Sequence, residues 1–196
     1  MVDTAMIQLV LLALASSTAE ELDDRALSRR IKQGDHQAFQ SFFDGHYDSL
    51  LRFLLSKNID SQTAQDLIQK AFLYIWEHRY NIDPEKSLRS YLFRIAYTRM
   101  LNHHRDNKKF NTEQAVPARK TDLTPEDSAR ASDLQNAIER ALQKMPDKRG
   151  TVFQLCFMQD LTYREAAKIL EVSVKTIENH MGLAFKDMRQ ALQKFR

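Results

Sequence analysis

The spacing of the large apolar side chains limits what this chain can fold into more than any other feature. Six of them recur at i, i+1, i+4, i+5, i+8 and i+9, which places them on one face of a helix; they are Leu67, Ile68, Ala71, Phe72, Ile75 and Trp76. Similar spacing recurs in residues 22–33, 36–54 and 88–96. The 196 residues include only four Gly and four Pro, so the turn residues that many short strands need are scarce. The sequence predicts an all-α protein.

Helix-capping residues divide the first half of the chain. Gly34 ends the first helical segment, and Asp35 can cap the long apolar helix that follows. A break within this helix at residues 44–45, an Asp-Gly pair, is left open. Asp60 can cap the next helix, and Pro84 disfavours helix at the residue before it. We expect helix to resume at about residue 87 and to end at about residue 108.

Two of these helices carry polar side chains opposite their apolar faces. In the first, a mixed stripe at i, i+3, i+4 and i+7 consists of Asp66, Gln69, Lys70 and Leu73. Such a stripe on its own indicates only a solvated face. In the later helix, the residues expected to face inward are Leu88, Tyr91, Leu92, Ile95 and Ala96. Its outer side is expected to carry Arg94, Tyr97, Arg99, Asn102 and Arg105.

Positive charge is concentrated in the middle of the chain. The net charge is +3, but residues 86–120 hold nine Lys or Arg against Asp106 and Glu113, an excess of seven positive charges. An excess of this size favours a polyanionic partner, with nucleic acid as the first candidate, and a solvated basic face is the alternative.

The sequence predicts two helical domains joined by a flexible linker. Residues 107–123 lose the apolar periodicity and are rich in Asn, Lys, Thr and Gln, as linkers often are. Thr124 can cap a new helix with Pro125 at its first position. The expected parts are an N-terminal extension, a first domain, the linker and a second domain, at residues 1–21, 22–106, 107–123 and 124–196.

The second domain contains a helix-turn-helix pattern from Thr162 to about Phe185. Thr162 and Glu165 form a capping-box sequence, residues 171–173 turn the chain, and Ser173 can cap a last helix that we expect to reach Lys194. In this geometry the start of the second helix enters the major groove, where we expect Ser173, Lys175, Thr176, Glu178, Asn179 and His180. Asn suits adenine, Glu suits cytosine, and Lys suits phosphate or guanine. The residues expected to pack inward are Ile177, Met181 and Ala184. A generic helical pair can produce the same pattern.

Five stretches resemble a known family. Residues 66–76 (DLIQKAFLYIW), 90–96 (SYLFRIA) and 102–105 (NHHR) resemble region 2 of the extracytoplasmic-function (ECF) sigma factors, the small members of the sigma-70 family. Residues 161–167 (LTYREAA) and 172–180 (VSVKTIENH) resemble their region 4. The order and spacing agree over most of the chain, from about residue 25 to its end.

The resemblance implies a transcription initiation factor, not an enzyme, that brings RNA polymerase core to promoter DNA and opens the duplex. Polymerase would be contacted by the polar stripe of Asp66, Gln69, Lys70 and Leu73. The minus-10 element would be contacted by Asn81, Asp83, Arg94, Tyr97, Thr98, Arg99, Asn102, Arg105, Lys108 and Lys109, with Ile82 in the same loop. Tyr97 could instead be a core residue. The minus-35 element would be contacted by Arg164, Ser173, Lys175, Thr176, Glu178, Asn179 and His180.

Two details concern the subtype. The family often has Asn where this chain has Thr98, which leaves the details of strand opening unsettled. Residues 175–180 (KTIENH) resemble the FecI-like versions common in the Bacteroidetes group, which often answer to a membrane-bound anti-sigma factor. An anti-sigma factor is therefore an expected partner, alongside RNA polymerase core and promoter DNA.

No cofactor, metal ion or small-molecule substrate is expected. Cys156 is the only cysteine, and its apolar neighbours indicate a small buried core residue. The His residues lack zinc-ligand spacing with it. Residues 5–15 are apolar but follow Asp3 without a basic residue, unlike a signal peptide, so a cytoplasmic location is expected.

Two other classes are considered. A two-component or quorum-type regulator can end in a similar helix-turn-helix, but its receiver or ligand domain normally contains parallel strands, and residues 22–106 show no strand-like apolar runs. An enzyme would need a phosphate loop, a nucleophile with its base, paired carboxylates or a metal cluster, and none is recognisable in the sequence.

Overall fold

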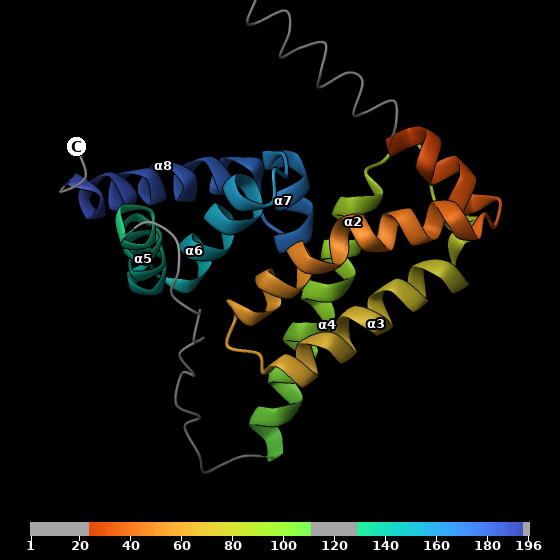
Figure 1. The fold of residues 1–196 in the computed structure, drawn as a ribbon, viewed down its shortest axis with the longest axis horizontal. Helices are drawn as coiled ribbons and strands as arrows, with labels where there is room; N and C mark the ends of the chain where they lie inside the picture. The colour runs from red at the N-terminus through yellow and green to blue at the C-terminus, as the bar shows by residue number, and fades with distance from the viewer. Residues whose placement is uncertain (1–23, 111–128, 194–196) are drawn as a thin grey trace, which may run out of the picture. The chain divides into compact units, whose positions relative to one another are not determined.

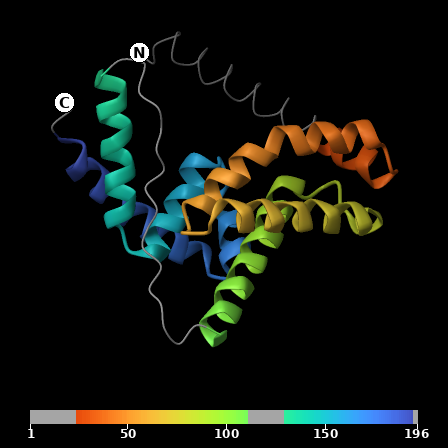
Figure 2. The same cartoon turned by 60° about the horizontal axis from the view of Figure 1, so that its bottom comes forward.

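The structure, a computed structural model, describes residues 24–110 and 129–193. The chain divides into two compact units, residues 1–103 and 104–196 (Figures 1 and 2), each described below by itself. Within the described residues every regular element is helical, which confirms the predicted all-α class. The strands that a receiver domain would need are absent from residues 24–110. The expected apolar extension, the Thr124 cap and most of the expected linker lie outside the described residues.

A helix over residues 24–32 is followed by α2 (His36–Leu55), α3 (Ser61–Glu77), the 3-10 turn η1 (Arg79–Asn81) and α4 (Leu88–Phe110), and the first unit includes α4 as far as His103. Helix α4 continues beyond the predicted start of the linker at residue 107. The domain boundaries stay a prediction.

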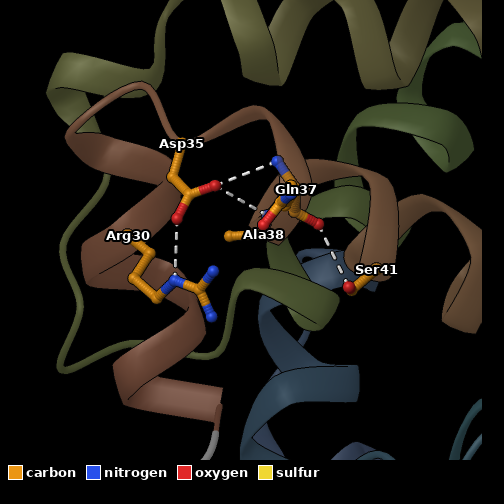
Figure 3. A network of polar contacts seen from close by, with 5 residues as sticks. All are labelled: Arg30, Asp35, Gln37, Ala38 and Ser41. Atoms are coloured by element: carbon orange, nitrogen blue, oxygen red, sulfur yellow. Dashed lines mark hydrogen bonds and ion pairs between the residues drawn. The ribbon is translucent and has the colours of Figure 1, made fainter.

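The caps at the start of α2 and α3 are those the sequence predicts. Gly34 adopts a φ of +88°, a left-handed conformation that Gly reaches without strain, and this allows the chain to turn between the helices. Asp35 then caps α2 by accepting the N–H groups of Gln37 and Ala38 at 2.9 and 3.1 Å, and Arg30 pairs with its other oxygen at 2.8 Å (Figure 3). Asp60 caps α3 by accepting the N–H of Thr63 at 3.0 Å.

Helix α2 is continuous, so the break considered at residues 44–45 is absent. Its buried face continues from Phe42 on one side of this pair to Leu50 and Phe53 on the other. Since one stripe packs against the core along the whole length of the helix, a kink would have separated its two halves from their partners.

Aromatic rings join α2 to α3. Phe39, Phe42 and Phe43 of α2 surround Phe72 of α3, with ring centroids 4.7 to 6.2 Å apart. The ring of Trp76 lies 4.9 Å from that of Phe39. The apolar face predicted for α3 is buried, apart from a half-buried Trp76.

Helix α4 buries a slightly different face from the one predicted. Leu88, Leu92 and Ala96 are buried as expected, together with Phe93 and Met100. Tyr91 is 37% exposed, so its inward assignment is wrong, and Ile95 is only half-buried. The reason is that Phe93 packs edge-on against Phe53 of α2, with ring centroids 5.6 Å apart, which moves Tyr91 to the margin of the contact.

In the second unit, α5 (Ala129–Lys144), α6 (Asp147–Phe153) and α7 (Tyr163–Leu170) all pack against α8 (Val174–Ala191). Helix α8 ends before Lys194, which lies outside the described residues. A single π-helical turn, η2 (Gln154–Met158), follows α6. Cys156 lies in this turn and is only half-buried, because the wider turn rotates it away from the core that Val152 and Leu155 occupy. Desolvation raises the pKa of its thiol to about 11.

None of the described helices combines the length and the apolar character needed to cross a membrane.

Candidate nucleic-acid interface

Helices α7 and α8 and the turn between them form a helix-turn-helix. The side chain of Thr162 accepts the N–H of Glu165 at 3.2 Å, and the carboxylate of Glu165 accepts the N–H of Thr162 at 2.8 Å, which completes the predicted capping box. Glu171 ends α7 in the left-handed conformation with φ 54°, and Ser173 caps α8 by accepting the N–H of Thr176 at 3.1 Å. Three residues, 171–173, therefore reverse the chain between two capped helices.

The predicted reading residues lie on the open side of α8. Ile177, Met181 and Ala184 are buried against the rest of the unit, as expected. The exposed positions around them include Ser173, Lys175, Glu178 and Asn179, and Arg164 is exposed on α7. Thr176 and His180 are half-buried. Most of the predicted set thus shares one accessible surface.

Contacts within this surface fix some of the side chains in advance. Lys175 pairs with Glu178 at 3.2 Å, and the hydroxyls of Ser173 and Thr176 lie 2.8 Å apart. The Nδ1 atom of His180 is buried and has no hydrogen-bond partner among the described residues. The surface therefore offers two cations, Lys175 and Arg164, together with one amide and two hydroxyls, which are the groups that contact base edges and phosphates.

The predicted outer face of α4 is partly confirmed. Arg94, Thr98, Asn102 and Arg105 are exposed, and their spacing places them along one side of the helix. Six Lys or Arg against Asp106 make this helix strongly basic. Lys108 and Lys109 belong to its last turn, and their side chains lie outside those described.

Two of the residues predicted for this face are half-buried. The ring centroid of Tyr97 lies 6.4 Å from that of Phe53, and burial raises the pKa of its hydroxyl. The guanidinium of Arg99 lies 5.7 Å from the ring centroid of Tyr74 on α3. Tyr97 is therefore partly packed in the core and partly exposed, and its contact with DNA stays a prediction.

The loop between α3 and α4 carries Asn81 and Asp83, both exposed. Asp83 pairs with Lys86 at 2.8 Å and accepts the N–H of Glu85 at 3.2 Å, and these hydrogen bonds lower the pKa of its carboxyl. Ile82 lies between them but is only 5% exposed. Ile82 is therefore a core residue and not a surface contact, because its apolar side chain anchors the loop.

Residues of the helix 24–32, which sequence reasoning did not assign to the site, hold this loop. The Nζ of Lys32 donates to the carbonyl oxygen of Ile82 at 2.8 Å. Arg25 and Arg29 both pair with Glu85, at 3.3 and 3.1 Å. No short-range pattern in the sequence indicates these contacts, because the partners lie 50 or more residues apart.

The polar stripe of α3 lies on its exposed side. Asp66, Gln69 and Lys70 are exposed, and Leu73 is 54% exposed. Lys70 pairs with Asp66 at 2.6 Å across one helical turn. A single exposed leucine is normal on a protein surface, so the exposure of Leu73 does not by itself identify a binding site.

Two family models match the chain. The model of sigma-70 region 2 matches residues 42–110, and that of sigma-70 region 4 matches residues 135–188. The ECF sigma factor SigW of Bacillus subtilis is 25% identical over 176 residues, covering 84% of this chain and 94% of the relative. The ECF sigma-E factor of Haemophilus influenzae is 24% identical over 186 residues, covering 89% of this chain and 98% of the relative.

Two solved structures have a similar fold. CnrH in complex with the cytosolic domain of CnrY has a TM-score of 0.61 and 26% identity, covering 87% of this chain and 97% of that one. The sigma factor RpoE from Bartonella quintana, in complex with the anti-sigma factor NepR, has a TM-score of 0.62 and 17% identity, covering 81% and 98%.

The fold and both matched regions define a helical transcription factor made of a region 2 unit and a region 4 unit. Such a factor recognises promoters together with RNA polymerase and catalyses no reaction of its own. The chain belongs to the sigma-70 family and, within it, to the ECF sigma factors. The FecI-like subtype stays a prediction.

Proposed function

We propose that α8 reads the minus-35 element of the promoter. The single observation that carries this proposal is the division of α8 into two faces, with Ile177, Met181 and Ala184 buried and Lys175, Glu178 and Asn179 exposed at its start. The carboxamide of Asn179 can pair with adenine, and Glu178 can accept from cytosine once Lys175 turns toward a phosphate. The residues that border these groups contact the phosphate backbone of the DNA; they are Arg164, Ser173, Thr176 and His180.

The second part of the proposal concerns α4 and the loop before it. The phosphates of the minus-10 element are neutralised by the cations of α4, namely Arg94, Arg99, Arg105, Lys108 and Lys109. Its bases are contacted by Tyr97, Thr98 and Asn102 of α4 and by Asn81 and Asp83 of the loop. The excess of positive charge in α4, together with the exposure of Arg94 and Arg105, supports this assignment. Opening the duplex requires unpaired bases to be held by stacking and hydrogen bonds, and the same surface offers an aromatic ring and amide groups for that purpose.

The third part concerns protein partners. The stripe of Asp66, Gln69, Lys70 and Leu73 contacts RNA polymerase core through its exposed leucine, with the Lys70 and Asp66 pair at its edge. An anti-sigma factor binds the free chain, as the complex of the similar protein CnrH with the cytosolic domain of CnrY suggests. A cytoplasmic location follows from these partners. No cofactor, metal ion or small-molecule substrate takes part.

The test of minus-35 reading uses the holoenzyme formed with RNA polymerase core and a promoter library randomised at the minus-35 element. Asn179→Ala and Glu178→Ala should each relax the preference at one position, because a base-reading contact discriminates by about 1 to 3 kcal/mol. Gln190→Ala, an exposed substitution near the other end of α8, is the matched control and should leave the preference unchanged. If both reading variants select the same sequences as the parent chain, a different face of α8 meets the DNA.

The test of phosphate contacts uses the salt dependence of promoter binding. Removing the charges of Lys108 and Lys109 together should weaken binding about equally for all sequences and should lower the slope of log K against log salt by about 2, since each phosphate contact contributes about 0.9 to it. The control removes two exposed charges outside α4, Lys144 at the end of α5 and Lys148 in α6. An unchanged slope for the first variant would contradict the assignment.

A further inference from the structure

Tyr80 is the most exposed large apolar or aromatic side chain among the described residues, at 66%. It lies in η1, directly before Asn81 and at the start of the loop between α3 and α4. Sequence reasoning assigned it no role. A single exposed aromatic is common on protein surfaces and needs no explanation by itself. The contacts beneath Tyr80 are what distinguish it.

Arg79 holds the ring of Tyr80 from below. Its guanidinium carbon lies 4.4 Å from the centroid of the Tyr80 ring and 4.6 Å from that of Trp76, so the cation lies against both rings. Its two terminal nitrogens donate hydrogen bonds to the hydroxyl of Tyr80 at 2.7 Å and to the carbonyl oxygen of Trp76 at 2.9 Å. The orientation of the tyrosine is therefore fixed by a charged group with partners on both sides.

Ring contacts also link Trp76 to α2. The ring centroid of Trp76 lies 4.5 Å from that of His36 and 4.9 Å from that of Phe39, with the rings tilted in both pairs, so a series of contacts connects α2 to Tyr80. On the other side of Asn81, Ile82 is buried and its carbonyl oxygen accepts a hydrogen bond from Lys32. The backbone on both sides of the exposed ring is thus anchored.

A fixed aromatic ring with an accessible face is suited to stacking on a nucleobase. The ring loses little conformational freedom when a base arrives, because its position is already set in the free protein. Stacking is also tolerant of sequence, since every base has a flat face, and the Arg79 cation beneath the ring favours a negatively charged strand nearby. A base in duplex DNA is covered by its neighbours, so only an unpaired base can use this surface.

We propose that Tyr80 is a stacking platform for one unpaired base of the opened promoter, next to the base contacts assigned to Asn81. This inference rests on the proposed contact of α4 and its preceding loop with the minus-10 element. It adds a residue whose contribution is to hold the opened strand, without reading which base is present. Its ligand is a single-stranded nucleic acid.

The experiment measures binding of the holoenzyme to a promoter that carries an unpaired bubble over the minus-10 element. Tyr80→Ala should weaken binding by about 5- to 150-fold, the range that loss of one stacked base produces. Tyr80→Phe keeps the ring and loses only the hydroxyl, so it should bind close to the parent level. Tyr80→Leu keeps apolar bulk without an aromatic face and should fall between the two.

An abasic series then identifies the base. One nucleotide of the bubble at a time is replaced by an abasic site, and the ratio of parent to Tyr80→Ala affinity is measured on each template. The proposal requires this ratio to fall to about one at a single position, because the ring has nothing to stack on there. The control, Tyr163→Ala, removes an exposed tyrosine of the other unit and should give a ratio that does not depend on position.

Two results would overturn the proposal. The first is parent-level affinity of Tyr80→Ala on the intact bubble, and the second is a defect that persists at every abasic position. Tyr80 is exposed, so the thermal midpoint should not change; if it falls for the alanine variant, the comparison of Tyr80→Leu with Tyr80→Phe decides. If the parent holoenzyme does not prefer the bubble to the duplex, the proposed minus-10 contact itself is wrong. This result is distinguishable from a failure of the Tyr80 proposal, because it is obtained with the parent chain alone.

Discussion

Helices α4 and α8 both carry exposed polar faces for which we propose DNA contacts, but the sequence positions the two helices in different ways. Helix α8 is set by short-range signals, namely the capping box of Thr162 and Glu165, the left-handed Glu171 and the Ser173 cap. The rotation of α4 depends on rings from other helices, because Phe53 of α2 packs on Phe93. A reading surface built on local signals can be recognised in a sequence, whereas one built on tertiary packing is visible only in the structure.

Helices α4 and α8 also differ in charge, and this difference matches the roles proposed for them. Helix α4 carries six Lys or Arg against one Asp, whereas Lys175 at the start of α8 is already paired with Glu178. Phosphate contacts supply affinity without sequence information, and base contacts supply specificity. This charge pattern is the one expected if α4 contributes most of the affinity and α8 most of the sequence preference, as proposed above.

The largest expected effect comes from removing a buried ring of α4. Phe93→Ala should lower the free energy of unfolding of the first unit by about 3 to 5 kcal/mol, because it leaves a cavity against Phe53. Trp76 is the only tryptophan and lies in this unit, so its fluorescence during urea unfolding reports the change.

The matched variant in the second unit is Ile177→Ala. If the two units unfold independently, the second unit should lose its helical signal at a lower urea concentration than in the parent chain. The urea midpoint reported by Trp76 fluorescence should then stay unchanged. A shift of the Trp76 midpoint by Ile177→Ala would show that the units are energetically coupled, and the comparison of two separate surfaces would then need revision.

A smaller effect is expected when the local signal of α8 is weakened. Thr162→Ala removes the capping hydroxyl and should destabilise the second unit by about 1 kcal/mol, with a corresponding loss of minus-35 binding. Circular dichroism during thermal unfolding measures the first quantity and a binding titration measures the second. Thr162→Ser keeps the hydroxyl and should restore both; if it behaves like the alanine variant, the capping bond is not the cause.

A substitution at Glu171, which ends α7 with φ 54°, is expected to stabilise the second unit. A side chain in the left-handed region costs about 1 kcal/mol, so Glu171→Gly should raise the stability of the second unit by roughly that amount. Glu171→Gln, which removes the charge and keeps the strain, is the control. Equal thermal midpoints for the glycine variant and the parent would indicate that this turn is not strained.

The smallest expected effect is a loss of stability of the first unit at low pH. The caps of α2 and α3 are carboxylates whose pKa values lie below the ordinary 3.8, for Asp35 mainly because it accepts the N–H of Ala38 and for Asp60 because it accepts hydrogen bonds from Thr63. A lowered pKa means that the ionised form is stabilised by folding, so this contribution is complete above about pH 4 and is lost as the pH falls through the lowered values.

The measurement is the urea midpoint of Trp76 fluorescence between pH 6 and pH 2.5. The parent chain should lose stability below about pH 4, and a chain with Asp35→Asn and Asp60→Asn should lose less, because asparagine can also cap a helix but does not titrate. Identical pH profiles would show that these two carboxyl groups contribute nothing to the acid sensitivity of the first unit.

The sequence was sufficient to predict the elements with strong local signals. The caps at Asp35, Asp60, Thr162 and Ser173 and the buried face of α3 appear as expected, because each depends on residues within a few positions of one another. The exposure of the α3 stripe follows from the same periodicity. The DNA-reading residues at the start of α8 are predicted from the helix-turn-helix pattern, whereas the roles proposed for α3, α4 and the loop between them depend on the resemblance to a family.

The features that the sequence did not predict depend on contacts between distant segments. Tyr91 was placed inward because its spacing fits a helical face, but the packing of Phe93 decides which edge of α4 is covered. Tyr80 has no sequence signal at all, since its support by Arg79 depends on how the chain bends after α3. The burial of Ile82 likewise follows from the tertiary fold and not from its polar neighbours.

The contacts that Lys32, Arg25 and Arg29 make with the loop before α4 have a practical consequence for protein engineering. Exchanging this loop for that of another sigma factor would break interactions with residues that lie 50 or more positions earlier in the chain. A hybrid made to switch promoter preference would therefore need both segments to be transferred together. The loop and the helix form one interchangeable cassette, although the sequence separates its two parts.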